Sequence, residues 1–368
     1  MKDSVPVVTA NFSPFRLVLR SSDIWEPKLE EINSRAYDYV KLHRLSSYYD
    51  VGIAPFSLGV CFDGTLVLPA VPQFRDRSAA VAQFNKTLSE LLLGGIYCEA
   101  VSPDDVGFGT ISFTGYARIS GGATGAAASF HIAARTKHIG TLDVIRLLNP
   151  ETVTTESLQS ALTTSRKLLG ALEEVPREQL LYGATFYVRK QWAESLIHLW
   201  TVTERIIEIA WQRYVLTSQI PLPSKRRAFL EDHRTWSAAT KLEVLFQKTL
   251  LPANIYEKLD AARKARNDLA HRGTVPSRDT VQVSLEGCFE LASLCASVFA
   301  DTRLFDSVIR LIVSRCNPQL FPERTKFGID EVSHWLPLPP LPGDPEWGDR
   351  EYEIIEDLVL KPIQRQEC

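Results

Sequence analysis

The chain lacks the long apolar runs that mark membrane-spanning helices. None of its 368 residues belongs to a run approaching the roughly 18 apolar residues that such a helix needs, and its first residues show no signal-peptide core. Of its six cysteines, no two form a Cys-x-x-Cys pair and none joins a histidine at zinc-site spacing. We therefore expect a cytoplasmic protein in a reducing compartment, with no membrane association, metal or cofactor.

Phosphate-loop signatures are also missing. The glycine-rich stretch 121–125 is followed by no Lys-Ser or Lys-Thr pair, and the pattern G-x-G-x-x-G does not occur. This stretch is therefore interpreted as a loop. His131 and His138, which flank Arg135, are expected to be ordinary surface or half-buried histidines.

The composition is that of a globular protein, but the charge is unevenly distributed. Hydrophobic residues make up 45% of the chain and charged residues 23%, and the length suffices for two domains. Residues 1–185 carry 17 basic and 19 acidic side chains, residues 186–316 carry 19 and 14, and residues 317–368 carry 5 and 11. The mildly basic middle segment is compatible with phosphate binding.

The first 180 residues mix strand and helix patterns. Residues 15–20 alternate apolar and polar side chains like a strand, and Asp63-Gly64 between two apolar runs predicts a tight hairpin. Further predicted elements are a helix over 77–93, strands over 96–101 and 110–120, and a helix over 155–172. We predict a mixed α/β domain over residues 1–180, whose role is open and which is a candidate sensor or regulatory domain.

From residue 181 the pattern becomes helical. Apolar positions at helical spacing predict helices over 186–215, 238–250, from about 254 to 273, and 278–301. Cys288 and Cys295, seven residues apart, are expected in the core of the last of these. The predicted fold class is thus α+β, with a mixed N-terminal domain, an all-helical domain over 181–316, and a proline-rich acidic tail over 317–368.

One helix end concentrates polar and cationic side chains. Arg263, Arg266, Asn267 and His271 fall in the last turns of a predicted helix that ends at Gly273. Residues four apart share a helix face, which aligns Asn267 with His271 and with Arg263. Only this histidine, among the seven in the chain, has an arginine five positions before it.

The pattern Arg-Asn-x-x-x-His near a helix end, within an all-helical region, resembles the HEPN superfamily. The resemblance covers about residues 186–316. It implies a small helical bundle that dimerises and that acts either as a metal-independent ribonuclease or as a nucleotide-binding or scaffold domain. It also implies that an acidic residue of the first long helix orients the arginine, which here suggests Glu204 opposite Arg266 or Arg263.

The chemistry of RNA self-cleavage suits these residues. Attack of a 2′-hydroxyl on the neighbouring phosphate requires proton transfers, for which His271 is suited because histidine titrates near neutral pH. Arg266 keeps its charge and fits two phosphate oxygens, and Asn267 can position the histidine or the phosphate. One histidine per chain is too few for both the acid and the base role, and the dimer implied by the resemblance supplies the second.

A second basic cluster, Lys225-Arg226-Arg227, has two interpretations. It is either a solvated surface or a contact to the RNA backbone, since basic side chains are drawn to phosphate without reading sequence. Together these features predict an RNA endonuclease that acts on RNA as a homodimer, in bacterial antiviral defence or a stress response.

A non-catalytic interpretation remains open. Arg266 could pair with Asp260 or Glu257 along its own helix, and His271 could interact with the helix C-terminal dipole. The protein would then be a dimerisation, nucleotide-binding or scaffold protein that uses the same bundle.

Overall fold

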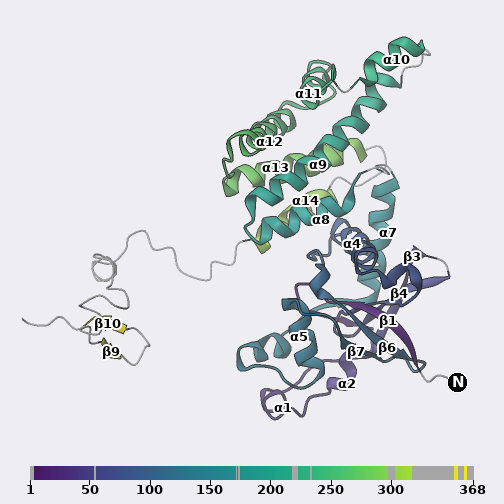
Figure 1. Cartoon of the computed structure of the whole chain (residues 1–368), viewed down its shortest axis with the longest axis vertical. Coiled ribbons are helices and arrows are strands. Elements are labelled where there is room, and N and C mark those ends of the chain that lie inside the picture. Colours follow the sequence, from purple (N-terminus) through teal and green to yellow (C-terminus); the bar gives the residue numbers. More distant parts are fainter. Residues whose placement is uncertain are drawn as a thin grey trace, which may run out of the picture. The chain divides into compact units, whose positions relative to one another are not determined.

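The computed structural model describes residues 4–53, 55–170, 172, 175–217, 223–232, 234–296, 303–316, 352–354 and 360–362. The chain divides into two compact units, residues 1–317 and 318–368. The first unit contains an antiparallel sheet with helices, followed by a helical region (Figure 1). The α+β fold class predicted from the sequence is confirmed.

The N-terminal part of the first unit is built on a six-stranded antiparallel sheet in the order β3-β4-β5-β1-β6-β7. Its strands are β1 (Ser4–Ala10), β3 (Leu45–Ile53), β4 (Phe56–Cys61), β5 (Leu66–Pro69), β6 (Val106–Ser112) and β7 (Ala117–Gly121). The predicted hairpin is confirmed as β4 and β5, with Gly64 at φ +82° in its turn. A left-handed φ of this kind is what glycine adopts without strain.

Two strand predictions in this half are wrong. Residues 96–101 form no strand, and the single strand expected over 110–120 is two strands joined by a turn. Gly115, at φ +82°, donates its backbone N–H to the Ser112 carbonyl at 3.0 Å and reverses the chain. The alternation of apolar and polar residues continues through this turn, so the pattern alone does not reveal it.

Two long helices and several short ones accompany the sheet. The long α4 (Arg77–Leu93) begins and ends where predicted, and it contacts β1 and β6 on one side and α7 on the other. The other elements of this half are α1 (Leu29–Asn33), α2 (Tyr39–Leu42), α3 (Pro72–Arg75), α5 (Ala126–Arg135), α6 (Val144–Leu148), α7 (Thr155–Gly170), two 3-10 turns at Pro103–Asp105 and Thr141–Asp143, and the parallel pair β2 (Arg16–Leu19) and β8 (Glu151–Thr154).

The turn of the β4–β5 hairpin holds a buried ionic cluster. The Asp63 carboxylate accepts hydrogen bonds from Arg135 Nε and Nη2, both at 2.7 Å, and lies 3.0 Å from His131 Nδ1. All three side chains are at most 2% exposed. The expectation that His131 lies at or near the surface is therefore wrong, because α5 carries it, together with Arg135, against the hairpin turn.

The C-terminal part of the first unit is helical. Its helices are α8 (Arg177–Val188), α9 (Trp192–Trp211, continued by a π-helical segment Gln212–Leu216), α10 (Ser224–Glu231), α11 (Ala238–Gln247), α12 (Ala253–Arg272), α13 (Arg278–Ala296) and α14 (Arg303–Arg315). The helix predicted over 186–215 is confirmed from Trp192 onward, but its predicted start is wrong, since Lys190 at φ +60° separates α8 from α9. Ser195 Oγ then donates to the Gly183 carbonyl at 2.8 Å and holds the two helices together.

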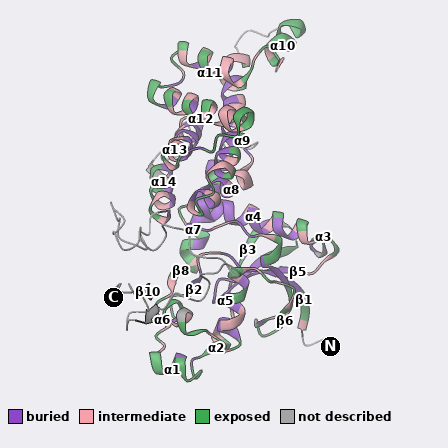
Figure 2. Cartoon of the chain, turned by 60° about the vertical axis from the view of Figure 1, so that its left-hand side comes forward, coloured by how far each residue is buried: buried purple, intermediate pink, exposed green. Residues whose placement is uncertain are grey.

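One apolar core continues from the sheet into the helices. It includes Val8 of β1, Leu88 of α4, Leu181 of α8 and Leu259 of α12, and Figure 2 shows buried residues along this path. The boundary predicted near residue 180 falls inside this core and stays a prediction. Cys288 and Cys295 are buried in α13, as predicted.

The second unit is described only at two short antiparallel strands, β9 (Tyr352–Ile354) and β10 (Leu360–Pro362). The proline-rich stretch of the predicted tail lies outside the described residues. Among the described helices, none has the length and apolar character needed to cross a bilayer.

Candidate functional site: the end of helix α12

Helix α12 carries the residues singled out by the sequence, which we call the α12 motif: Arg266, Asn267 and His271. The helix ends where predicted, with Gly273 in a left-handed conformation at φ +67° and its N–H bonded to the Leu269 carbonyl at 3.0 Å. The helix packs against α13 and α9 through a face that buries Ile255, Leu259 and Ala262. Arg266 follows Ala262 by four residues and Leu259 by seven, so it continues this packed face at its partly buried end, whereas His271 is exposed.

Two of the three motif residues are in contact. Arg266 Nη1 donates to Asn267 Oδ1 at 3.3 Å, and both side chains are half-buried. His271 is exposed, and within the described part of the chain its side chain forms no hydrogen bond or ion pair. The imidazole is thus accessible to a ligand at the end of the helix.

Arg266 differs from the other basic side chains of its helix. Its only partner among the described residues is the neutral amide of Asn267. The others all pair with carboxylates: Lys258 with Glu286 and Glu290, Arg263 and Lys264 with Asp260, and Arg272 with Asp268. The pairing of Arg266 with Asp260 or Glu257, considered as an alternative, is not formed.

Asp260 is committed to its own partners. Arg263 Nη2 and Lys264 Nζ donate to it at 2.6 and 2.7 Å. Partial burial acts to raise its pKa, but the hydrogen bonds from Lys264 and Arg263 outweigh burial and leave the pKa of Asp260 lowered. Because this carboxylate stays ionised, it partly offsets the charges of Arg263 and Lys264, which share it, whereas Arg266 has no carboxylate partner among the described residues.

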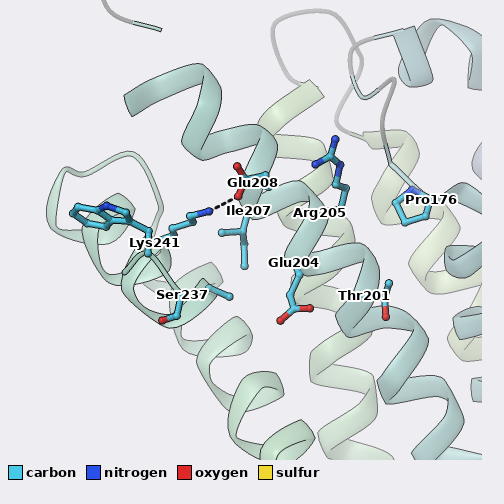
Figure 3. Close-up of a pocket in the computed structure, with 10 residues that line it drawn as sticks. Pro176, Thr201, Glu204, Arg205, Ile207, Glu208, Ser237 and Lys241 are labelled. Atoms are coloured by element: carbon cyan, nitrogen blue, oxygen red, sulfur yellow. Dashed lines mark hydrogen bonds and ion pairs between the residues drawn. The ribbon is translucent and has the colours of Figure 1, made fainter. Parts of the chain in front are cut away.

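Glu204 does not orient either arginine. It is exposed on α9 and lines a cavity of about 570 Å³ with residues of α11 (Figure 3). No hydrogen bond or ion pair links it to Arg263 or Arg266 within the described segments. Its neighbour Glu208 pairs with the buried Lys241 of α11 instead.

The basic cluster Lys225-Arg226-Arg227 lies on α10, with all three side chains exposed. Arg227 is partly neutralised, because its Nε donates to Glu231 at 2.9 Å. Phe229, 53% exposed, shares a helix face with Lys225 and Arg226 through i+4 and i+3 spacing. This face combines two cations and an aromatic ring.

The structure does not bring this basic face to the α12 motif. Trp211 Nε1 donates to the Leu230 carbonyl at 3.1 Å, which places α10 at the C-terminal end of α9. His271 lies just before α13, whose start is held beside the end of α8 by a 3.1 Å hydrogen bond from Tyr187 to Gln282. The two sites are thus near opposite ends of α9, whose 20 residues span about 30 Å.

Cation ligands do not gather at any place in the described segments: no three His, Cys, Asp or Glu side chains are grouped to hold a metal ion. The residue patterns also did not predict a cavity of the N-terminal sheet, described below, that is lined by basic and hydroxyl-bearing residues. These residues come from several distant segments of the chain. Comparison of the chain with protein-family models, with curated proteins and with solved structures finds no match.

Proposed function

We propose that the protein is a metal-independent RNA endonuclease of the HEPN type, with the α12 motif as its active site. The observation that carries this proposal is an Arg266 with no carboxylate partner among the described residues, one helical turn and a half before an exposed His271 at the end of a packed helix. A cation left without a carboxylate partner is available for a phosphate oxygen, and an arginine holds two such oxygens in a fork.

The proposed reaction uses the RNA as its own nucleophile. The 2′-hydroxyl loses its proton to one imidazole and attacks the adjacent phosphorus, while Arg266 stabilises the extra negative charge on the phosphorane. The bond from phosphorus to the 5′-oxygen breaks, and a second imidazole protonates that oxygen. The products are a 2′,3′-cyclic phosphate and a 5′-hydroxyl end.

A second chain is part of this proposal, because each chain contributes one His271. Val275, four residues beyond the histidine, is 64% exposed and offers an apolar side chain next to the motif. Two copies meeting at this helix end would cover Val275 and bring two imidazoles to one phosphate. The homodimer is therefore proposed as the active form.

A non-catalytic role is the second candidate, and one observation favours it. Catalytic imidazoles are commonly held by a hydrogen-bonded neighbour, yet among the described residues nothing orients His271, and Glu204 does not orient Arg266. In this alternative the same helices serve dimerisation, nucleotide binding or scaffolding.

The products of RNA cleavage distinguish these candidates. We expect the purified protein to cut single-stranded RNA in the presence of EDTA and to leave 5′-hydroxyl ends, which polynucleotide kinase labels directly, and 2′,3′-cyclic phosphates. A substrate with a single 2′-deoxy nucleotide at the cleavage position should resist cutting there. Cleavage that requires a divalent metal, or that leaves 5′-phosphates, would contradict the proposed mechanism, and an intact dimer with no cleavage would favour the scaffold.

The basic face of α10 is expected to hold RNA without taking part in the chemistry. Replacing Lys225 or Arg226 with alanine should weaken RNA binding. It should also make the negative slope of the log association constant against log salt concentration less steep by about 1 for each side chain. Arg227→Ala is the matched control and should change the slope less, because Glu231 already partly balances its charge. Binding isotherms between roughly 50 and 200 mM salt measure this, and equal slopes for all variants would mean that α10 makes no phosphate contact.

A further inference from the structure

A second large cavity lies on the N-terminal sheet, far in the sequence from the α12 motif. Its volume is about 780 Å³, within the range of small-molecule sites. The walls come from the start of β1, from β6 and β7, from α2 with the residue that follows it, and from the end of α5, so several elements of the fold define its shape.

The lining is rich in hydroxyl groups and contains no carboxylate. Its lining residues include the serines and threonines Ser4, Thr110, Ser112, Thr114 and Thr136, together with Tyr39 and Tyr116. None of the twelve lining residues is an aspartate or glutamate, whereas two are arginines and one is histidine. A ligand in this cavity therefore meets neutral donors and acceptors and positive charge.

Arg118 supplies the available positive charge. It is exposed on β7 and forms no ion pair or side-chain hydrogen bond within the described part of the chain. Lys137 adds a second cation near the cavity, with its ammonium 4.3 Å from the centre of the Tyr39 ring. Arg135, by contrast, is held by Asp63 and by the Ala117 carbonyl at 3.0 Å, so it forms part of the wall.

The back of the cavity is rigidly built. The His43 ring lies between two backbone carbonyls, with Nδ1 3.1 Å from that of Ala117 and Nε2 3.2 Å from that of Arg135. Burial and the nearby charge of Arg135 lower the pKa of His43, and the neutral ring carries one N–H, which it donates to one of these two carbonyls. The half-buried ring thus lies between β7 and the end of α5 and forms part of the wall.

We propose that this cavity binds a small phosphorylated, hydroxyl-bearing compound, such as a nucleotide or a sugar phosphate. Arg118 would bind the phosphate by charge-assisted hydrogen bonds, and the serine and threonine hydroxyls would bind the sugar hydroxyls. This site does not depend on RNA cleavage at α12, so either can be present without the other.

Calorimetric titration of the full chain tests the proposal. AMP and ribose 5-phosphate serve as phosphorylated probes, adenosine and ribose as their unphosphorylated counterparts, and inorganic phosphate as the bare anion. We expect saturable binding of at least one phosphorylated probe, and at least tenfold weaker binding of its unphosphorylated counterpart and of phosphate alone. Binding of AMP but not ribose 5-phosphate identifies a nucleotide site, and the reverse or equal binding identifies a sugar-phosphate site. Absence of saturable binding for both phosphorylated probes overturns the proposal.

Variants assign the binding to this cavity. Arg118→Gln should weaken binding of the phosphorylated probe about tenfold to a hundredfold, which is the usual effect of losing a hydrogen bond to a charged group. Thr110→Val removes one hydroxyl while keeping a side chain suited to the strand, and should weaken binding of the same probe by several fold. Lys167→Gln on α7 removes the same charge from an exposed position outside the cavity, so unchanged affinity is expected. Equal affinity in Arg118→Gln and the wild type would place the binding elsewhere and overturn the assignment.

Discussion

Replacing His271 with alanine is expected to lower RNA cleavage at neutral pH by about 10²- to 10⁴-fold, the usual contribution of a positioned acid or base. Within the described segments His271 has no structural partner, so its loss should not disturb the fold. Arg266→Ala should cost about 10²- to 10³-fold, as loss of one oxyanion-stabilising group does. Arg266→Lys should restore little of the rate, because lysine lacks the planar fork. Single-turnover cleavage rates at saturating RNA measure these effects.

The matched control lies next to the histidine. Arg272 is 75% exposed and paired with Asp268 at 3.2 Å, so Arg272→Ala removes a cation from the same helix end without touching the motif. We expect its cleavage rate to stay within about threefold of the wild type. Circular dichroism and sedimentation of every variant separate lost chemistry from lost fold or dimer. If His271→Ala and Arg272→Ala lose activity equally, general charge attraction is the cause and the α12 motif is not the active site.

The parts of the fold that were predicted correctly are those with local signals. Gly273 at the end of α12 and Gly64 in the β4–β5 turn both adopt left-handed backbone that glycine tolerates best. The break between α8 and α9 falls at Lys190, which adopts φ +60°, and no glycine or proline marks this break in the sequence. Apolar residues lie on both sides of this break, so the predicted helix began at residue 186, within the last turn of α8.

In the candidate site, too, the features with local signals were predicted and those set by long-range packing were not. The alignment of Asn267 with Arg263 and His271 follows from helix geometry and needs no tertiary structure. The position of Glu204 depends on the rotation of α9 about its own axis, which is set by packing. That packing directs Glu204 toward α11 and the cavity of Figure 3, away from the predicted contact with the arginines. Long-range placement of this kind leaves no trace in residue spacing.

The buried cluster at the β4–β5 turn should dominate the stability of the first unit. Asp63→Asn is expected to destabilise the protein by about 3–5 kcal/mol, because it leaves the Arg135 guanidinium buried without a counter-charge. Arg135 is 2% exposed, so water cannot replace the carboxylate. The Asp63 side chain also accepts the Thr65 backbone N–H at 3.1 Å, and the amide oxygen of asparagine can keep this hydrogen bond, so the expected loss reports the missing charge. Denaturant unfolding, followed by far-UV circular dichroism, measures the change.

Asp143→Asn is the control, because Asp143 pairs with Arg146 at the surface, where both side chains are more than 40% exposed. Such a pair contributes about 0–1 kcal/mol, so a loss as large as that of Asp63→Asn would contradict the role of burial.

The pH dependence gives a second test of the same cluster. Burial alone would raise the pKa of Asp63, but Arg135 and His131 outweigh it and hold this pKa well below its usual range. A carboxylate whose pKa is lower in the folded state stabilises fully above its unfolded pKa, about 3.9, and loses that contribution as the pH falls toward the folded value. The difference in free energy of unfolding between wild type and Asp63→Asn should therefore be constant near neutral pH and decrease progressively below about pH 4. A difference that is unchanged down to pH 2, or that increases, would mean that the ionised Asp63 carboxylate is not what stabilises the turn.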